Sequence, residues 1–277
     1  MMDSLILWII VFTALGGVLS VLAAATFLLL PESTRTRMLS PMVSFAIGTL
    51  LGASFLAILP HAFEMDVDAH HVTLTVLCGI LVFFLLEKMV IWRHCHTHDC
   101  DVHGSPHDAG SDTHGAAEAR VPDMERARNA AAGNLILIGD GIHNLVDGVL
   151  IAAAFLTDIH LGIITSIAVI AHEIPQELGD FAILLGSGYS RGQALLYNAL
   201  TGLTTVIGGV VAYYSLALAN QLVPYVLAIA ASSFIYIAVA DLIPGLHKRP
   251  EFSATVQQIL LIGLGIIVIY ATHSTLH

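Results

Sequence analysis

The sequence predicts an all-α polytopic membrane protein with eight transmembrane helices. Its 277 residues have a mean hydropathy of +0.83 and only 11% charged residues, whereas a soluble domain carries about 25%. Apolar segments of the length that crosses a bilayer as a helix, about 20 residues, recur along the whole chain. The ten Lys and Arg residues gather in alternate connections between these segments. Composition, segment length and charge distribution therefore favour the same fold class.

The expected spans follow one another with short connections and a single long one. They cover residues 5–30, 41–60, 72–92, 133–156, 160–186, 193–219, 221–245 and 254–272. The N-terminus lacks the basic region of a secretory signal, so the first apolar segment is expected to be a retained span. The chain is thus expected to divide into spans one to three (1–93), a disordered His-rich cytosolic loop (94–129) and spans four to eight (130–277).

Basic residues predict the orientation of the spans. Arg35 and Arg37 lie between spans one and two, Arg191 between spans five and six, and Lys248 and Arg249 between spans seven and eight. The others lie at the end of span three or in the long loop: Lys88, Arg93, Arg120, Arg126 and Arg128. The positive-inside rule makes this side cytoplasmic. Both termini are then expected on the outer side of a plasma or inner membrane.

Two connections carry histidines. The connection at residues 61–71 is acidic, is expected on the outer side and can gather cations, with an ordinary solvated loop as the alternative. The long loop holds six His and two Cys between residues 94 and 114. Such a stretch binds metal weakly, so we expect a flexible sensor or buffer, with a plain spacer as the alternative. The net charge of −11 argues against a nucleic-acid partner.

Spans four and five each carry a polar stripe within an apolar segment. A helical residue advances about 100° around the axis, so each set of polar residues falls on one face. Ionisable groups at this depth cost several kcal/mol unless they are paired or bound to something. Facing stripes of imidazole and carboxylate groups would form a buried cage that suits zinc and its first-row neighbours. The predicted metal ligands are His143, Asn144, Asp147, His172, Glu173, Gln176 and Glu177.

Other polar residues are expected along a transport path, and each has a simpler explanation. The predicted path residues are Asp140, Asp180, Asn198, Asp241 and His61. Asp140 sits at the edge of its span and could only hydrate it, and His61 could be an ordinary loop residue. Asn144 could join two helices by a hydrogen bond instead of binding metal. Pro175 is expected to kink span five where the ligands lie, because it removes a backbone donor.

Two other functions would use the same polar stripes. The segment His172-Glu173-Ile-Pro175-Gln176 begins like the H-E-x-x-H motif of zinc proteases, including those that act within membranes. It departs from that motif at Gln176, where the second His would stand, and at Pro175. A proton-driven carrier of an organic ion would also use buried carboxylates, but it does not obviously need two His and an Asn converging with them.

Spans two and seven are similar to each other. Residues 53–61 read ASFLAILPH, and residues 232–244 read SSFIYIAVADLIP. In the expected topology these spans run in opposite directions. Spans one to three and six to eight are therefore expected to form inverted repeats around spans four and five, an arrangement common in transporters.

At these residues the sequence resembles the ZIP (Zrt-, Irt-like protein) family of divalent metal transporters. The resemblance covers nearly the whole chain. It rests on His143-Asn144-x-x-Asp147-Gly148 in span four and His172-Glu173-x-Pro175-x-Glu177 in span five, with Leu59-Pro60-His61 ending span two. The fifth span is most similar to the branch whose motif is His-Glu-x-Pro-His-Glu. The resemblance implies transport of Zn²⁺, and in some members Fe²⁺, Mn²⁺ or Cd²⁺, into the cytoplasm, and no enzymatic activity.

The resemblance also implies a two-metal centre and a sliding movement. One position would use His143, His172 and Gln176, the other Asn144 and Glu173, with Asp147 shared. Spans one, four, five and six would slide against the others. The expected partners are divalent metal ions and the lipid bilayer, and the sequence leaves homodimer formation open.

The sequence departs from the family's pattern at four positions. Gln176 stands where the branch has His, and Asp147 stands where many members have the longer Glu. Asn198 stands where some members place a carboxylate, and Ala57 where the branch often has His. A single, weaker and less selective metal site is therefore the alternative to the two-metal centre.

Overall fold

The computed structural model describes residues 2–27, 29–95, 120–247 and 251–276, and this part of the chain is helical with no β-strand. The helices are α1 (Met2–Phe27), α2 (Glu32–Ala53), α3 (Leu59–Glu64), α4 (Ala69–Cys95), α5 (Arg120–Thr157), α6 (Ile159–Gly186), α7 (Arg191–Leu218), α8 (Val223–Tyr236), α9 (Ile243–Leu246) and α10 (Phe252–Leu276). Within these residues, eight helical segments are long and apolar enough to cross a membrane, which confirms the predicted fold class.

Span boundaries differ modestly from the prediction, and the helices flanking the long loop differ more. The second span runs over Arg37–Glu64 instead of 41–60. Helix α4 continues to Cys95 and α5 already begins at Arg120, so the described edges of the segment expected as a disordered loop are helical. Residues 120–132 are rich in alanine and arginine, which favour helix. Residues 96–119, with most of the expected His-rich loop, lie outside the described residues.

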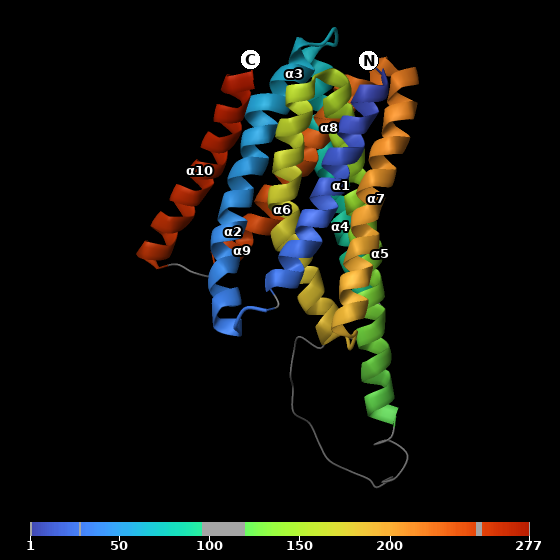
Figure 1. The fold of residues 1–277 in the computed structure, drawn as a ribbon, viewed down its shortest axis with the longest axis vertical. Helices are drawn as coiled ribbons and strands as arrows, with labels where there is room; N and C mark the ends of the chain where they lie inside the picture. Colours follow the sequence, from blue (N-terminus) through green and yellow to red (C-terminus); the bar gives the residue numbers. More distant parts are fainter. Residues whose placement is uncertain (1, 28, 96–119, 248–250, 277) are drawn as a thin grey trace.

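The helices stand side by side in one bundle (Figure 1). Both chain ends lie at one end of it, together with α3, as an even number of spans requires. We call this the terminal end. The start of α5 lies at the opposite end, which we call the loop end. Helix α6 contacts α1, α2 and α5, and α7 packs along α5 and α1. The polar face of α6 is therefore enclosed on several sides by other spans.

Spans two and seven are interrupted by π-helical turns at corresponding places. The turns are Ser54–Ile58 and Ile237–Leu242, and each is followed by a hydrophobic residue and a proline, Pro60 or Pro244. A proline has no backbone N–H and its ring crowds the carbonyl four residues earlier. Widening the preceding turn relieves this crowding, which accounts for a π-helical turn before each proline.

The α5–α7 contact is close because glycines on both helices remove the side chains between them. A Cβ atom on Gly148 would overlap the carbonyl of Thr205, and one on Gly208 would overlap the carbonyl of Leu145. The two backbones therefore touch directly, as in small-residue contacts between membrane helices. This contact fixes how α5 is rotated, and hence where Asn144 and Asp147 point.

Candidate metal centre

Four of the predicted ligands come together between α5 and α6. One ligand atom from each of His143, Asp147, His172 and Glu173 lies within 4.8 Å of the other three, and no other group of three or more His, Cys, Asp or Glu in the described residues meets this spacing. His143 and Asp147 are one turn apart on α5, and His172 and Glu173 are adjacent on α6. The expected meeting of the two polar stripes is therefore present in the structure.

The spacing of these atoms matches a small tetrahedral cation. The Nε2 atoms of His143 and His172 are 3.3 Å apart. His172 Nε2 lies 3.2 Å from Asp147 Oδ2 and 3.9 Å from Glu173 Oε1. His143 Nε2 lies 3.7 Å and 3.5 Å from the same two oxygens. Metal–ligand bonds of about 2.1 Å place the corners of a tetrahedron roughly 3.4 Å apart, which is the range observed.

The ring of His172 is held with one nitrogen turned toward the group. Its Nδ1 atom lies 3.0 Å from the carbonyl oxygen of Ala168, one turn earlier on α6. A carbonyl oxygen can only accept, so Nδ1 carries the hydrogen and Nε2 of the neutral ring keeps its lone pair. Metal-binding histidines are commonly oriented by such a hydrogen bond. The ring also packs edge-on against Phe234, with centroids 5.9 Å apart.

The two carboxylates of the group need a positive partner. Asp147 is fully buried and Glu173 is 3% exposed, and none of their four carboxylate oxygens has a hydrogen-bond partner among the described residues. Two carboxylates and two neutral imidazoles carry a charge of −2, which one divalent cation balances. A buried and unbalanced pair of this kind is costly in a bilayer, so the chemistry of the donor set fits a transition-metal dication.

Asn144 is engaged by its neighbours. Its amide nitrogen donates to Asp140, at Oδ1 over 3.0 Å and at the backbone carbonyl over 3.2 Å. Its amide oxygen accepts from the Thr205 hydroxyl of α7 over 2.7 Å. The residue thus makes the interhelical hydrogen bond considered from the sequence, and it borders the four-residue group without being part of it.

A second polar region continues from the group toward the loop end. Glu177 is fully buried and its carboxylate oxygens lack a hydrogen-bond partner among the described residues. Asn198 of α7, also fully buried, donates to the Glu177 backbone carbonyl over 3.3 Å. Asp180 is partly exposed and, with Asp140, lies within electrostatic range of Glu177. Glu177 is therefore a predicted ligand that lies outside the four-residue group but in a connected acidic region.

The remaining predicted residues lie apart from this group. Gln176 is partly exposed, one turn after His172 on α6. Asp241 is exposed in the π-helical turn of span seven. His61 lies in α3 at the terminal end. Pro175 is buried within α6, which continues through it, and leaves the Ala171 carbonyl without its usual backbone donor.

The surroundings of the group differ between its two sides. On its terminal side, the halves of α5 and α6 beyond the group are packed with buried apolar residues: Leu150, Ile151, Ala152, Ala153, Ala154, Phe155, Leu161, Ile164, Ala168 and Val169. On the other side, the His143 side chain is 22% exposed, and Gln176 and Asp180 are partly exposed. The group is therefore bordered by partly exposed polar side chains on its loop-end side and by buried apolar side chains on its terminal side.

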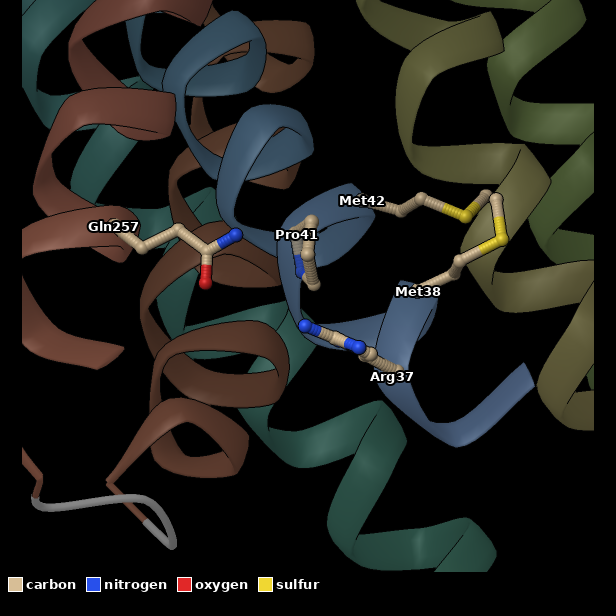
Figure 2. A pocket seen from close by; sticks show the side chains of 5 residues that line it. All are labelled: Arg37, Met38, Pro41, Met42 and Gln257. Carbon is tan, nitrogen blue, oxygen red and sulfur yellow. The ribbon is translucent and has the colours of Figure 1, made fainter. Parts of the chain in front are cut away.

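One pocket lies away from this group. It has a volume of about 410 Å³ and lies at the start of α2 and α10, where it is lined by Arg37, Met38, Pro41, Met42 and Gln257. Figure 2 shows Arg37 and Gln257 near Pro41, with both methionines projecting to the other side. None of these residues belongs to the four-residue group.

Sequence reasoning missed the hydroxyl groups that α7 directs at α5. Thr205 binds Asn144, and Thr204 donates to the Gly141 carbonyl over 2.8 Å. The sequence signal was present: Asn198, Thr201 and Thr205 recur at helical spacing and share a face. Threonines are common in apolar helices, where they bond their own backbone, so the spacing alone did not reveal a partner.

Replacing Thr205 by Val should destabilise the α5–α7 pair and disturb the centre. The variant keeps the side-chain shape but leaves the buried amide oxygen of Asn144 without its donor, at a cost of about 1–3 kcal/mol. We expect a lower midpoint of thermal unfolding in detergent. Thr73→Val on the exposed face of α4 is the matched control, and equal midpoints for the two variants would contradict this role of Thr205.

Comparisons with known proteins indicate one protein family. The family model described as ZIP zinc transporter matches residues 3–272. The chain is 31% identical over 264 residues to zinc transporter ZIP13 of Homo sapiens, covering 83% of this chain and 69% of that protein. It is 32% identical over 299 residues to zinc transporter zipt-7.2 of Caenorhabditis elegans, covering 93% and 64%.

A third relative is matched over a shorter region. Zinc transporter ZIP10 of Danio rerio is 39% identical over 162 residues, which is 54% of this chain but only 19% of that protein. The chain thus spans about a fifth of ZIP10 and about two thirds of the other two relatives. The family consists of transporters, so the intramembrane protease alternative has no support. With eight helices in its described residues that are long and apolar enough to cross a membrane, and a family match over residues 3–272, the chain is an integral multi-pass membrane protein that belongs to the ZIP zinc transporter family.

Proposed function

We propose that this protein carries divalent transition-metal ions, chiefly Zn²⁺, across a membrane into the cytoplasm. The observation that supports this most directly is the buried group of two imidazoles and two carboxylates at tetrahedral spacing between α5 and α6. The names of the relatives, all zinc transporters, support the same substrate. Fe²⁺, Mn²⁺ and Cd²⁺ are secondary substrates in this proposal, because they accept the same nitrogen and oxygen ligands.

We assign the first metal position to His143, Asp147, His172 and Glu173. A second position would lie toward the loop end, where Glu177 is buried beside Asn198 and near Asp140 and Asp180. The carboxylates there exceed what one dication balances. A second cation, or protons taken up when the ion leaves, would neutralise them.

The apolar packing on the terminal side of the group determines which conformational change uptake needs. In this conformation the side chains that border the first position on its loop-end side are partly exposed, whereas buried apolar residues pack against its terminal side. The basic residues at the loop end favour a cytoplasmic location for it by the positive-inside rule. With both termini outside, the partly exposed side of the group would face inward. Uptake then requires α1, α5, α6 and α7, which contact one another, to shift together relative to the other spans, so that the packed layer opens and the cytoplasmic side closes.

The helix contacts support an inverted repeat of spans one to three and six to eight. An axis relating the two triplets would exchange α1 with α7, α2 with α8, α4 with α10 and α5 with α6. Each helix contact on one side of this axis should then have an equivalent on the other side. The axis relates α2–α10 to α8–α4, and α7–α5 to α1–α6, and all four contacts occur. The π-helical turns of spans two and seven fall at related positions. Two similar halves around a central helix pair can exchange conformations, which gives alternating access to one site.

Zinc flux into proteoliposomes tests this function. Purified protein is reconstituted with a zinc-sensitive dye inside the vesicles, and Zn²⁺ is added outside. We expect saturable dye signals that need the protein and are absent from empty liposomes. An unmodified protein that folds and reconstitutes but gives no zinc flux would contradict the proposal.

Replacing Gln176 by His should tighten zinc binding and slow release. The amide of Gln176 lies one turn after His172 and is partly exposed, so an imidazole there has room to turn toward the group. One better ligand changes metal affinity by about tenfold. We expect the half-saturating zinc concentration in the flux assay to fall accordingly, with a lower maximal rate. Gln257→His, exposed on α10, is the matched control.

A further inference from the structure

Three histidines from distant parts of the chain gather at the terminal end. His61 belongs to α3, His160 to the first turn of α6, and His273 to the last turns of α10. The rings of His61 and His273 meet edge-on with centroids 5.9 Å apart. His160 Nδ1 lies 3.5 Å from Asp158 Oδ1. None of these groups belongs to the centre between α5 and α6.

Asp158 lies beside His160 and within electrostatic range of His61. It precedes α6, and its Oδ1 accepts from the backbone amides of His160 over 2.7 Å and Leu161 over 3.1 Å. Partial burial raises the pKa of this carboxyl, but these two hydrogen bonds and the nearby rings of His160 and His61 outweigh it, so its pKa is lowered overall. The carboxylate is thus held in its charged form, within electrostatic range of His61.

His61 is oriented in the same way as the central His172. Its Nδ1 atom lies 2.9 Å from the carbonyl oxygen of Ala57, one turn earlier, as His172 Nδ1 lies 3.0 Å from that of Ala168. The hydrogen of the neutral ring is therefore on Nδ1, and the lone pair is on Nε2. This hydrogen bond to a carbonyl is the arrangement that commonly prepares a histidine to bind metal.

The surrounding charge favours a cation. The connections at this end contain Glu64, Asp66, Asp68 and Asp158, and the sequence has no Lys or Arg between residues 38 and 87 or between 129 and 190. Negative charge without competing ammonium or guanidinium groups raises the local concentration of cations. His160 lies twelve residues before His172 on α6, which is about 18 Å along the helix. Buried apolar residues, among them Ile164 and Val169, fill the path between them.

We infer that His61, His160 and His273, with the Asp158 carboxylate, form a recruitment site for a divalent transition-metal ion. The donors match those of the central group, so the same class of ion binds, and this inference rests on the proposed transport function. In this conformation the ligand atoms are less tightly gathered than in the central group, the only one in the described residues that meets the 4.8 Å spacing. Weaker binding suits a site that must pass its ion onward when the packed layer opens.

Histidine modification resolved by mass spectrometry tests this site in the full-length protein. Diethyl pyrocarbonate is applied with and without Zn²⁺, and each histidine is quantified separately, which keeps the remaining histidines of the chain out of the readout. At a zinc concentration ten times the dissociation constant, we expect labelling of His61, His160 and His273 to fall about tenfold. His70 and His71, exposed at the same end, serve as internal controls and should stay labelled.

Two variants separate local binding from other causes of protection. Asp158→Asn keeps a residue that caps α6 but removes the charge, so it should weaken protection, whereas the control His70→Ala should not. In His172→Ala, which disables the central group, protection should persist. Equal labelling with and without zinc, or protection lost in His172→Ala, would overturn the recruitment site. Zinc flux without protection contradicts only this site, and protection without flux contradicts only the proposed transport.

Discussion

Zinc flux is expected to fall more than about 100-fold when Asp147 or His172 is replaced by Ala, because each replacement removes a direct ligand of the buried centre. Asp147 Oδ2 and His172 Nε2 lie 3.2 Å apart and both are shielded from solvent, so no water-exposed group can substitute for either. Loss of Asp147 also leaves the group with a single carboxylate against a dication. The measurement is the initial rate of zinc-dependent dye signal in proteoliposomes at matched protein density.

Conservative variants at the centre and variants far from it distinguish a loss of metal binding from a folding defect. Asp147→Asn and His172→Gln keep the side-chain size and are expected to lose flux nearly as fully, with an unchanged elution profile and helix content. His247→Ala and Glu251→Gln, both exposed at the loop end, should transport like the unmodified protein. Normal flux in well-folded Asp147→Asn and His172→Gln would remove the proposed centre.

Replacing Gly208 by Ala is expected to destabilise the protein by about 1–3 kcal/mol or more, because the new methyl group would overlap the Leu145 carbonyl of α5. Backbone cannot move aside as a flexible side chain can, so α5 and α7 must separate. Separation would also stretch the Thr205–Asn144 hydrogen bond and turn Asp147 away from His172. Thermal unfolding in detergent should show a lowered midpoint, and zinc flux should fall with it.

Gly263→Ala is the matched control for this substitution. Gly263 lies in α10, and a Cβ atom there would meet nothing within 4 Å. The added methyl group removes backbone freedom from a helical glycine, so its midpoint should stay the same or rise slightly. Equal losses of stability in Gly208→Ala and Gly263→Ala would show that the α5–α7 contact is not the cause.

The polar stripes of spans four and five could be predicted because helix periodicity is strict. Residues three and four apart share a face, so the spacing of His143 and Asp147 alone puts them on the same side of span four. The sequence did not show whether Asp147, shorter than the Glu of many family members, could reach the other ligands. In the structure its carboxylate comes within 3.2 Å of His172 and 3.7 Å of His143. The direct α5–α7 contact sets the rotation of α5 that points this short side chain inward.

Other features depended on contacts between spans that no single segment encodes. Glu177 shares the polar face of α6, yet the structure places it with Asn198 and outside the four-residue group, because its position one turn further along α6 carries it toward the loop end. His61, expected on a transport path, lies near His273 because α3 and the last turns of α10 meet at the terminal end. Residues 61 and 273 are too far apart in sequence for periodicity to relate them.

The sequence by itself determined the number of spans, the polar faces of the fourth and fifth spans and the chemical class of their ligands. These follow from local rules: bilayer thickness sets segment length, and helix geometry sets which residues share a face. Only the tertiary structure decided which four ligands meet, which side of the group is packed with buried apolar residues and which histidines gather at the terminal end. Those outcomes depend on the rotation and height of each helix against its neighbours, which backbone contacts at residues such as Gly148 and Gly208 fix across distant parts of the chain.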